Sequence, residues 1–353
     1  YGLASLRSIG KGGEITFVFL KRFRCRSAVS GVGFIHTTDF SSADTSRELQ
    51  QSKSMTPWRL PHEGRTLVGV PLCSSDAVIQ LRRIIIKNYH DEKLVGILHE
   101  AGSRELVVVC HGFQSSKERR PMANLALAFE REGISAFRFD FAGNGESEGS
   151  FQYGNYLREA EDLRAVVSYF HEEKRRISAI IGHSKGGNVA LLYASRYNDV
   201  STIVNISGRF FLERGIEGRL GKSFLERIKW HGFIDVRNKR GEVLYRVTEE
   251  SLMDRLTTDT RAACRSIHKD CRVLTVHGSE DEIVPTADAF EFARMILNHR
   301  LHIIEGANHE YTSHQQELAA AVLEFVRLDR DLCRNYCWES SSWVRGRSTR
   351  SCL

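Results

Sequence analysis

The stretch Ile180-Ile181-Gly182-His183-Ser184-Lys185-Gly186-Gly187-Asn188 decides the fold. The short, β-branched run before it, residues 177–181, predicts a buried strand, and residues 188–196 predict a helix. A strand, a sharp turn and a helix around Gly-x-Ser-x-Gly form the setting of a nucleophile elbow. Bulky side chains two positions from Ser184 would clash in such a turn, which explains Gly182 and Gly186. An ordinary glycine-rich turn would give the same pattern, so the elbow is a hypothesis at this point.

Strand-like and helix-like segments alternate on both sides of this stretch. Two apolar runs, 81–87 and 94–99, predict an antiparallel hairpin. The further predicted strands are 106–110, 135–139, 177–181, 202–206, 272–276 and 301–304, and the further predicted helices are 121–132, 156–171, 286–297 and 313–328. This alternation predicts a mostly parallel, doubly wound sheet with helices on both faces.

The alternation breaks at about 208–262, where aromatic residues are mixed with many charges. We expect a mostly helical insertion there, which acts as a cap on the sheet. Its aromatic residues Phe210, Phe211 and Trp230 suit the wall of an apolar or aromatic acyl pocket. They suit the small core of the insertion equally well, so both interpretations stay open.

The ends of the chain differ from its middle. Residues 1–38 carry six basic residues and one acid, and residues 330–353 carry five arginines and two acids. Residues 1–56 therefore predict a leader and linker that is either disordered or similar to an organellar transit peptide, and 331–353 predict a disordered tail. The folded domain is expected at 57–330. Its location is expected to be cytoplasmic or chloroplast/organellar, without secretion.

Composition excludes several classes of function. No run of 18 apolar residues is present, so no membrane span is expected. Because the basic excess lies in the flanks, a nucleic-acid partner is not expected. The eight cysteines form no Cys-x-x-Cys pair, which favours free thiols over a disulfide framework or a zinc site.

A serine nucleophile needs a base, and the base needs an orienting acid. Two loops after later predicted strands offer them: residues 277–285 contain Asp281, and residues 305–310 contain His309. The chain order Ser184, Asp281, His309 is that of α/β-hydrolases. Glu280, Glu282 and Asp288 are the alternative acids, while His111 and His183 are expected to be structural.

Five ordered motifs carry a resemblance to a known family: His111-Gly112-Phe113, residues 140–147, the elbow at 182–187, the loop His277 to Pro285, and Gly306-Ala307-Asn308-His309. From about residue 80 to 329 the chain resembles the α/β-hydrolase superfamily. It is most similar to the branch of serine aminopeptidase-like hydrolases, monoacylglycerol lipases and cinnamoyl (feruloyl) esterases, and to plant α/β-hydrolases of unassigned substrate.

The resemblance implies a role for each site residue. Ser184 attacks an acyl carbonyl, His309 transfers the proton, and Asp281 orients His309. The backbone N–H groups of Phe113 and Lys185 form the oxyanion hole. The side chain of Lys185 is expected to point to solvent, and the charge run 117–120 is expected to be a solvated face. No metal and no cofactor are implied.

The sequence thus predicts a serine hydrolase that cleaves a small-molecule carboxylic ester through an acyl-enzyme. Hydroxycinnamoyl and acylglycerol-type esters are the substrates that the resemblance suggests. A thioesterase or acyltransferase would use the same triad, and a non-catalytic ligand receptor would keep the same fold. An aminopeptidase would need acidic groups for the substrate ammonium, and the sequence places none.

Overall fold

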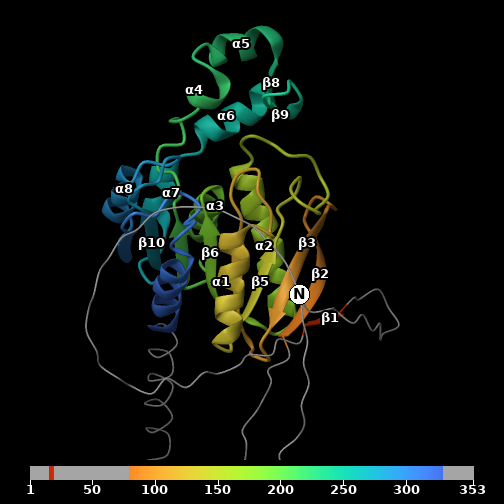
Figure 1. Ribbon diagram of the computed structural model, residues 1–353, viewed down its shortest axis with the longest axis vertical. Helices are drawn as coiled ribbons and strands as arrows, with labels where there is room; N and C mark the ends of the chain where they lie inside the picture. The colour runs from red at the N-terminus through yellow and green to blue at the C-terminus, as the bar shows by residue number, and fades with distance from the viewer. Residues whose placement is uncertain (1–15, 20–78, 329–353) are drawn as a thin grey trace, which may run out of the picture. The chain divides into compact units, whose positions relative to one another are not determined.

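The computed structural model describes residues 16–19 and 79–328 (Figure 1). In these residues the sheet has nine strands in the order β1-β2-β3-β5-β4-β6-β7-β10-β11. The strands are β1 Thr16–Phe19, β2 Ile79–Lys87, β3 Lys93–Glu100, β4 Glu105–Cys110, β5 Ser135–Phe139, β6 Arg176–His183, β7 Thr202–Ile206, β10 Arg272–Gly278 and β11 His299–Ile304. The six strands from β5 to β11 pair in parallel, whereas β2 and β3 form the predicted antiparallel hairpin. The fold class is therefore confirmed.

One short strand falls inside the leader for which no structure is predicted. Thr16–Phe19 forms β1, which pairs antiparallel with β2. The run Thr-Phe-Val-Phe consists of strong strand formers, and β2 would otherwise be an open sheet edge. The rest of the predicted leader and linker, and the whole predicted tail 331–353, lie outside the described residues.

Helices cover both faces of the sheet, as the alternation predicts. Helix α1 (Arg120–Arg131) and the helical residues 315–328 pack on one face, and α2 (Tyr156–Glu172), α3 (Lys185–Arg196), α7 (Thr260–Ser266) and α8 (Ala287–Met295) pack on the other. Strand β4 shows why both faces are buried, since Val107 and Val109 face one core and Val108 the other. In the described chain every helix is too short or too polar to cross a bilayer.

The cap lies between β7 and β10 and gathers at one end of the sheet (Figure 1). Its elements are α4 (Glu217–Leu220), α5 (Phe224–His231), β8 (Phe233–Arg237), β9 (Val243–Thr248) and α6 (Glu249–Thr257). It has its own small core, which Tyr153 joins from the main domain.

The sequence pattern misses the β8–β9 hairpin in this largely helical cap. The signal for it is the turn that begins at Asn238. The Asn238 side-chain oxygen accepts hydrogen bonds from the N–H groups of Arg240 and Glu242, and Gly241 supplies a positive φ of 83°. Strand-forming residues flank this turn. They are interleaved with charged residues, so neither side of the turn stands out in the sequence as an apolar run.

Candidate active site

Ser184 lies in a strained turn between β6 and α3. Its φ of 55° and ψ of −119° are rare for a residue with a side chain. A Cβ added at Gly182 would lie 2.1 Å from the oxygen of Gly186, and one added at Gly186 would lie 2.4 Å from the oxygen of His111. The predicted reason for both glycines is confirmed. Helix α3 starts at Lys185, three residues earlier than predicted. The prediction began later because glycine has a low helix propensity, but in the structure the glycines let the first turn of the helix pack closely against its neighbours.

The loop after β4 brings Phe113 to the same place, because β4 is the sheet neighbour of β6. A Cβ added at Gly112 would lie only 3.0 Å from the Cβ of Ser184. Within the described chain, the backbone N–H groups of Phe113 and Lys185 have no hydrogen-bond partner. Two unpaired donors therefore flank the serine, as an oxyanion hole requires.

The ring of Phe113 anchors this loop against the cap. It makes edge-to-face contacts with Phe151, Tyr153 and Tyr245, with ring centroids 5.3, 5.6 and 5.6 Å away. Tyr245 belongs to β9 of the cap. The cap therefore packs directly on a residue whose backbone faces Ser184.

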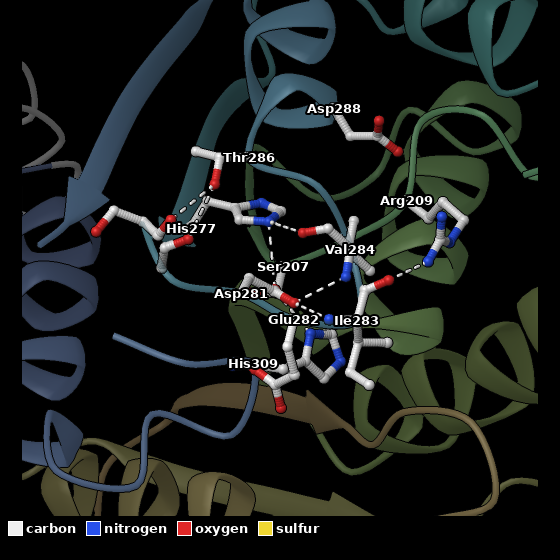
Figure 2. A network of polar contacts seen from close by, with 12 residues as sticks. Ser207, Arg209, His277, Asp281, Glu282, Ile283, Val284, Thr286, Asp288 and His309 are labelled. Atoms are coloured by element: carbon white, nitrogen blue, oxygen red, sulfur yellow. Dashed lines mark hydrogen bonds and ion pairs between the residues drawn. The ribbon is translucent and has the colours of Figure 1, made fainter. Parts of the chain in front are cut away.

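Asp281 and His309 follow β10 and β11 and form a direct hydrogen bond (Figure 2). His309 Nδ1 donates to Asp281 Oδ2 over 2.7 Å. Asp281 Oδ1 accepts from the N–H groups of Ile283 and Val284 at 2.9 and 2.8 Å, and His277 Nε2 lies 3.3 Å from Oδ2. The Asp281 carboxylate is thus buried and fixed from several sides.

The charge of Asp281 is stabilised by these contacts. Burial of the carboxyl group opposes ionisation, but the hydrogen bonds from His277, His309 and Val284 outweigh it. The pKa of Asp281 is therefore lowered well below its usual value. An ionised carboxylate at this position keeps the proton of neutral His309 on Nδ1 and leaves the Nε2 lone pair free.

The alternative acids have other partners. Asp288 accepts a hydrogen bond from the N–H of Phe210 at 2.8 Å, and Glu282 accepts one from the backbone N–H of His309 at 3.2 Å. Glu280 is exposed to solvent. Of the four acids, Asp281 is the one whose carboxylate contacts the His309 ring.

Ser184 and His309 line the same cavity, of about 150 Å³. The structure has no hydrogen bond between these two described residues. Such contacts are often long without substrate and tighten when it binds.

His111 and His183 are buried and bonded to backbone. His111 Nε2 accepts from the N–H of Phe141 at 3.1 Å, and His183 Nε2 donates to the carbonyl of His309 at 2.9 Å. Burial lowers the pKa of each ring to about 4, and for His183 the charge of His309 adds to the effect. Both rings therefore stay neutral and hold the site loops in position.

The expectation that the Lys185 side chain points to solvent is wrong. This side chain is 4% exposed, and its Nζ lies 2.6 Å from Glu159 Oε1 on α2, above the ring of Tyr156. Burial raises the pKa of Glu159 to about 7, and the charge and hydrogen bond of Lys185 oppose that rise. The ion pair ties the start of α3, and with it the elbow, to α2.

Replacing Lys185 by Met is expected to lower the free energy of unfolding by about 3–5 kcal/mol, because Glu159 would be left buried without its partner. Chemical denaturation of the purified variant measures this loss. The double variant Lys185→Met, Glu159→Leu is the control and should recover most of it. A single variant as stable as the wild type would show that the pair contributes nothing.

Lys117 is a second correction, since it is buried rather than part of a solvated face. Its Nζ lies 2.6 Å from Asp140 Oδ2 and 2.8 Å from Glu146 Oε2. Asp140 directly follows the buried strand β5 and is itself buried, so this lysine supplies the charge that the carboxylate needs. Arg119 and Arg120 in the same run are exposed, as expected.

The three aromatic residues predicted to contact substrate do not line either of the two cavities at Ser184. Phe210 packs in the main core, 5.2 Å from the ring of Phe292. Phe211 packs beside it with Arg214 over its ring, and Trp230 on α5 is 85% exposed. The aromatic character of a residue in the insertion therefore does not tell whether it lines a substrate pocket or packs in a hydrophobic core.

Sequence reasoning missed four polar residues that line the second cavity, Tyr156, Arg209, Arg219 and Arg255. This cavity adjoins Ser184 and is also lined by Phe113 and Lys185, but His309 does not line it. The three arginines are scattered among the other charges of the cap region in the sequence. No spacing rule connects them, because the fold rather than a motif brings them together.

Comparison with known proteins agrees with this geometry. A sequence profile of the family described as serine aminopeptidase, S33, matches residues 101–263. A monoacylglycerol lipase of Mycolicibacterium smegmatis is 29% identical over 107 residues, which cover 30% of this chain and 38% of the lipase. An uncharacterized protein of Saccharomyces cerevisiae is 26% identical over 230 residues, 59% of this chain and 69% of that protein.

Among solved structures, Est1E of Butyrivibrio proteoclasticus with bound ferulic acid matches with a TM-score of 0.60 and 24% identity. The match covers 69% of this chain and 97% of Est1E, and it shows the fold. The resemblance that the five motifs indicate is thereby confirmed. The chain has the α/β-hydrolase fold, and its sequence is similar to hydrolases of the esterase and lipase type.

Proposed function

We propose that this protein is a serine esterase in which Ser184 is the nucleophile, His309 the general base and Asp281 the orienting acid. One observation carries the proposal. Ser184, in a strained turn, shares a cavity with His309, whose Nδ1 is bonded to the buried Asp281. Acyl transfer through a serine requires a base beside the nucleophile and an acid that orients the base.

In the proposed reaction the Ser184 Oγ attacks the carbonyl carbon of the ester while His309 Nε2 takes the hydroxyl proton. The tetrahedral oxyanion is held by the N–H groups of Phe113 and Lys185, and loss of one such donor typically costs about 3 kcal/mol of transition-state stabilisation. When the intermediate collapses, the C–O bond to the alcohol breaks and His309 returns the proton to the leaving oxygen. Water then repeats these steps on the acyl-enzyme and releases the acid.

The names of the relatives suggest which esters to test. Est1E was solved with ferulic acid and the Mycolicibacterium protein is a monoacylglycerol lipase, so hydroxycinnamoyl esters and monoacylglycerols belong in the first panel. The aromatic residues Phe210, Phe211 and Trp230 give no support for either class, because they do not line the cavities.

The purified protein is expected to hydrolyse short 4-nitrophenyl esters with a burst of nitrophenol equal to one equivalent of enzyme, because acylation precedes a slower attack by water. Stopped-flow absorbance at 400 nm measures both phases, with Ser184→Ala as background. If ethanol is added, mass spectrometry separates the ethyl ester from the free acid. Mainly transferred product would favour an acyltransferase, and no turnover of any ester in the panel would contradict the proposal.

A further inference from the structure

The second cavity at Ser184 is strongly cationic. Its lining includes the side chains of Lys185, Arg209, Arg219 and Arg255 and no Asp or Glu. Lys185 is neutralised by Glu159, as described above. The three arginines have no comparable partner, since no carboxylate of the described chain lies within 4.0 Å of any of them.

Arg255 on α6 is the most informative of the three, because it is only 7% exposed. Its guanidinium donates to the carbonyl oxygens of Leu212 and Arg214 at 2.9 and 3.3 Å and to the Tyr156 hydroxyl at 3.4 Å. All these acceptors are neutral. The guanidinium carbon also lies 5.2 Å from the centroid of the Tyr153 ring. A buried guanidinium whose partners are all uncharged lacks a balancing anion, which is costly unless an anion occupies the space beside it.

Arg209 and Arg219 add to the same positive field. Arg209 donates to the carbonyl oxygen of Ile283 in the loop that holds Asp281 (Figure 2). Arg219 on α4 lies over the ring of Phe113, with its guanidinium carbon 4.6 Å from the ring centroid. Burial lowers the pKa of Arg209, and the charges of Arg255 and Arg219 lower it further, opposed by Asp288.

Asp288, whose charge acts on Arg209, and Asp254, the chain neighbour of Arg255, form no ion pair with the three arginines. Asp288 Oδ2 accepts from the backbone N–H of Phe210, and Asp254 Oδ2 accepts from that of Tyr156. Figure 2 shows Asp288 apart from the Arg209 guanidinium, without a contact between them. The three arginines therefore lack a direct carboxylate partner in the described chain, and the charge of Asp288 offsets only part of that of Arg209.

The position of the cavity indicates which part of an ester would enter it. His309 must reach the leaving oxygen to protonate it, so the alcohol belongs on the side of the cavity that His309 lines. His309 does not line the cationic cavity, so this is the side left for the acyl group; Arg209 and Arg255 line this cavity alone, whereas Arg219 lies where the two cavities meet and lines both. Its volume of about 40 Å³ is that of one to a few water molecules, which leaves room for only the terminal group of a short acyl chain.

We infer that the substrate is an ester whose acyl group ends in an anionic oxygen group, a carboxylate or a phosphate, bound by Arg209, Arg219 and Arg255. This inference rests on the proposed function, because it assigns the acyl side of the same site. Arginine suits the task, since its planar donors bind carboxylate and phosphate in a bidentate manner. Half-esters of short dicarboxylic acids are the simplest substrates of this kind.

The test compares esters that differ only in the terminal charge. Mono-4-nitrophenyl glutarate and adipate are paired with 4-nitrophenyl pentanoate and hexanoate, and Ser184→Ala protein supplies the background of self-hydrolysis. A 4-nitrophenyl ester of 4-phosphonobutanoate separates phosphate from carboxylate. The anionic esters are expected to have at least about ten-fold higher kcat/KM than their neutral partners, and this preference should fall as salt screens the charges. Equal or lower kcat/KM for the anionic esters would overturn the inference.

Three variants assign the preference to residues. Arg255→Gln keeps a donor but removes the charge, and Arg219→Gln removes the charge of an exposed side chain. Both should reduce the ratio of anionic to neutral kcat/KM, Arg255→Gln towards one. Arg227→Gln is the matched control, because Arg227 also lies in the cap and donates to a carbonyl, that of Leu220, but does not line the cavity. A ratio unchanged in both Arg219→Gln and Arg255→Gln would refute the assignment.

A binding measurement separates failure of this inference from failure of the proposed function. Calorimetry on Ser184→Ala protein compares glutaramate, which carries an amide in place of the ester and a terminal carboxylate, with pentanamide. Glutaramate should bind at least about ten-fold more tightly, and Arg219→Gln should weaken that binding. Tight binding without turnover of any ester would keep the anion site and reject the esterase. Equal binding of the two amides would reject the anion site whatever the turnover.

Discussion

Replacement of Ser184 by Ala is expected to reduce the hydrolysis of 4-nitrophenyl esters by roughly 10³-fold or more while leaving the fold intact. In the proposed reaction the side chain supplies the attacking oxygen, and it makes no hydrogen bond that holds the structure, whereas the strained backbone is fixed by the glycines around it. Removing Oγ therefore removes the covalent route and little else. Steady-state kinetics and thermal unfolding of the purified variant measure the two effects separately.

The matched control for this variant is Ser115→Ala. Ser115 lines the same cavity as Ser184 and His309 but lies outside the elbow. Its loss should change kcat by no more than a few fold. Near wild-type turnover by Ser184→Ala, or an equal loss in both variants, would mean that Ser184 is not the nucleophile.

Replacement of Asp281 by Asn should lower kcat by about 10⁴-fold, the loss seen when a triad carboxylate becomes an amide. The Asn side chain keeps an oxygen for the N–H groups of Ile283 and Val284, so the loop should stay in place. Its NH₂ group would face His309 Nδ1, reverse the tautomer of the neutral ring and remove the charge that stabilises the imidazolium. Kinetics at neutral pH together with circular dichroism check both statements.

Glu280→Gln and Glu282→Gln are the controls, because these acids lie in the same loop. Glu282 contacts the backbone N–H of His309 rather than its ring, so its amide variant should cost much less. If either control were more damaging than Asp281→Asn, the assignment of the orienting acid would be wrong.

The fold and the placement of the proposed triad residues follow from local sequence. The residues around Ser184 are those that a tight strand-to-helix turn needs. The apolar runs before Asp281 and His309 identify the two strands that these residues follow. Parallel strands deliver their carboxyl ends to one edge of the sheet. Because each of the three residues follows a predicted parallel strand, the sequence alone was enough to predict that they lie close together.

The environment of the charged residues does not follow in this way. Lys185 is buried because Glu159, on a different helix, is buried beside it, and Lys117 because Asp140, itself buried, directly follows a buried strand. Whether a lysine faces solvent depends on a partner that only the tertiary structure supplies. Arg209, Arg219 and Arg255 meet for the same reason, whereas Phe210 shows that an aromatic residue in the insertion can belong to the main core.

The most direct test of the account is covalent labelling with a fluorophosphonate, which reacts with a serine only when base and oxyanion hole activate it. The purified wild-type protein should gain one phosphonyl group, located at Ser184 by peptide mass spectrometry. Labelling should be absent in Ser184→Ala and strongly slowed in Asp281→Asn. A folded wild-type protein that takes up no label, or takes it up at another serine, would contradict the claim that Ser184, His309 and Asp281 form a working catalytic site.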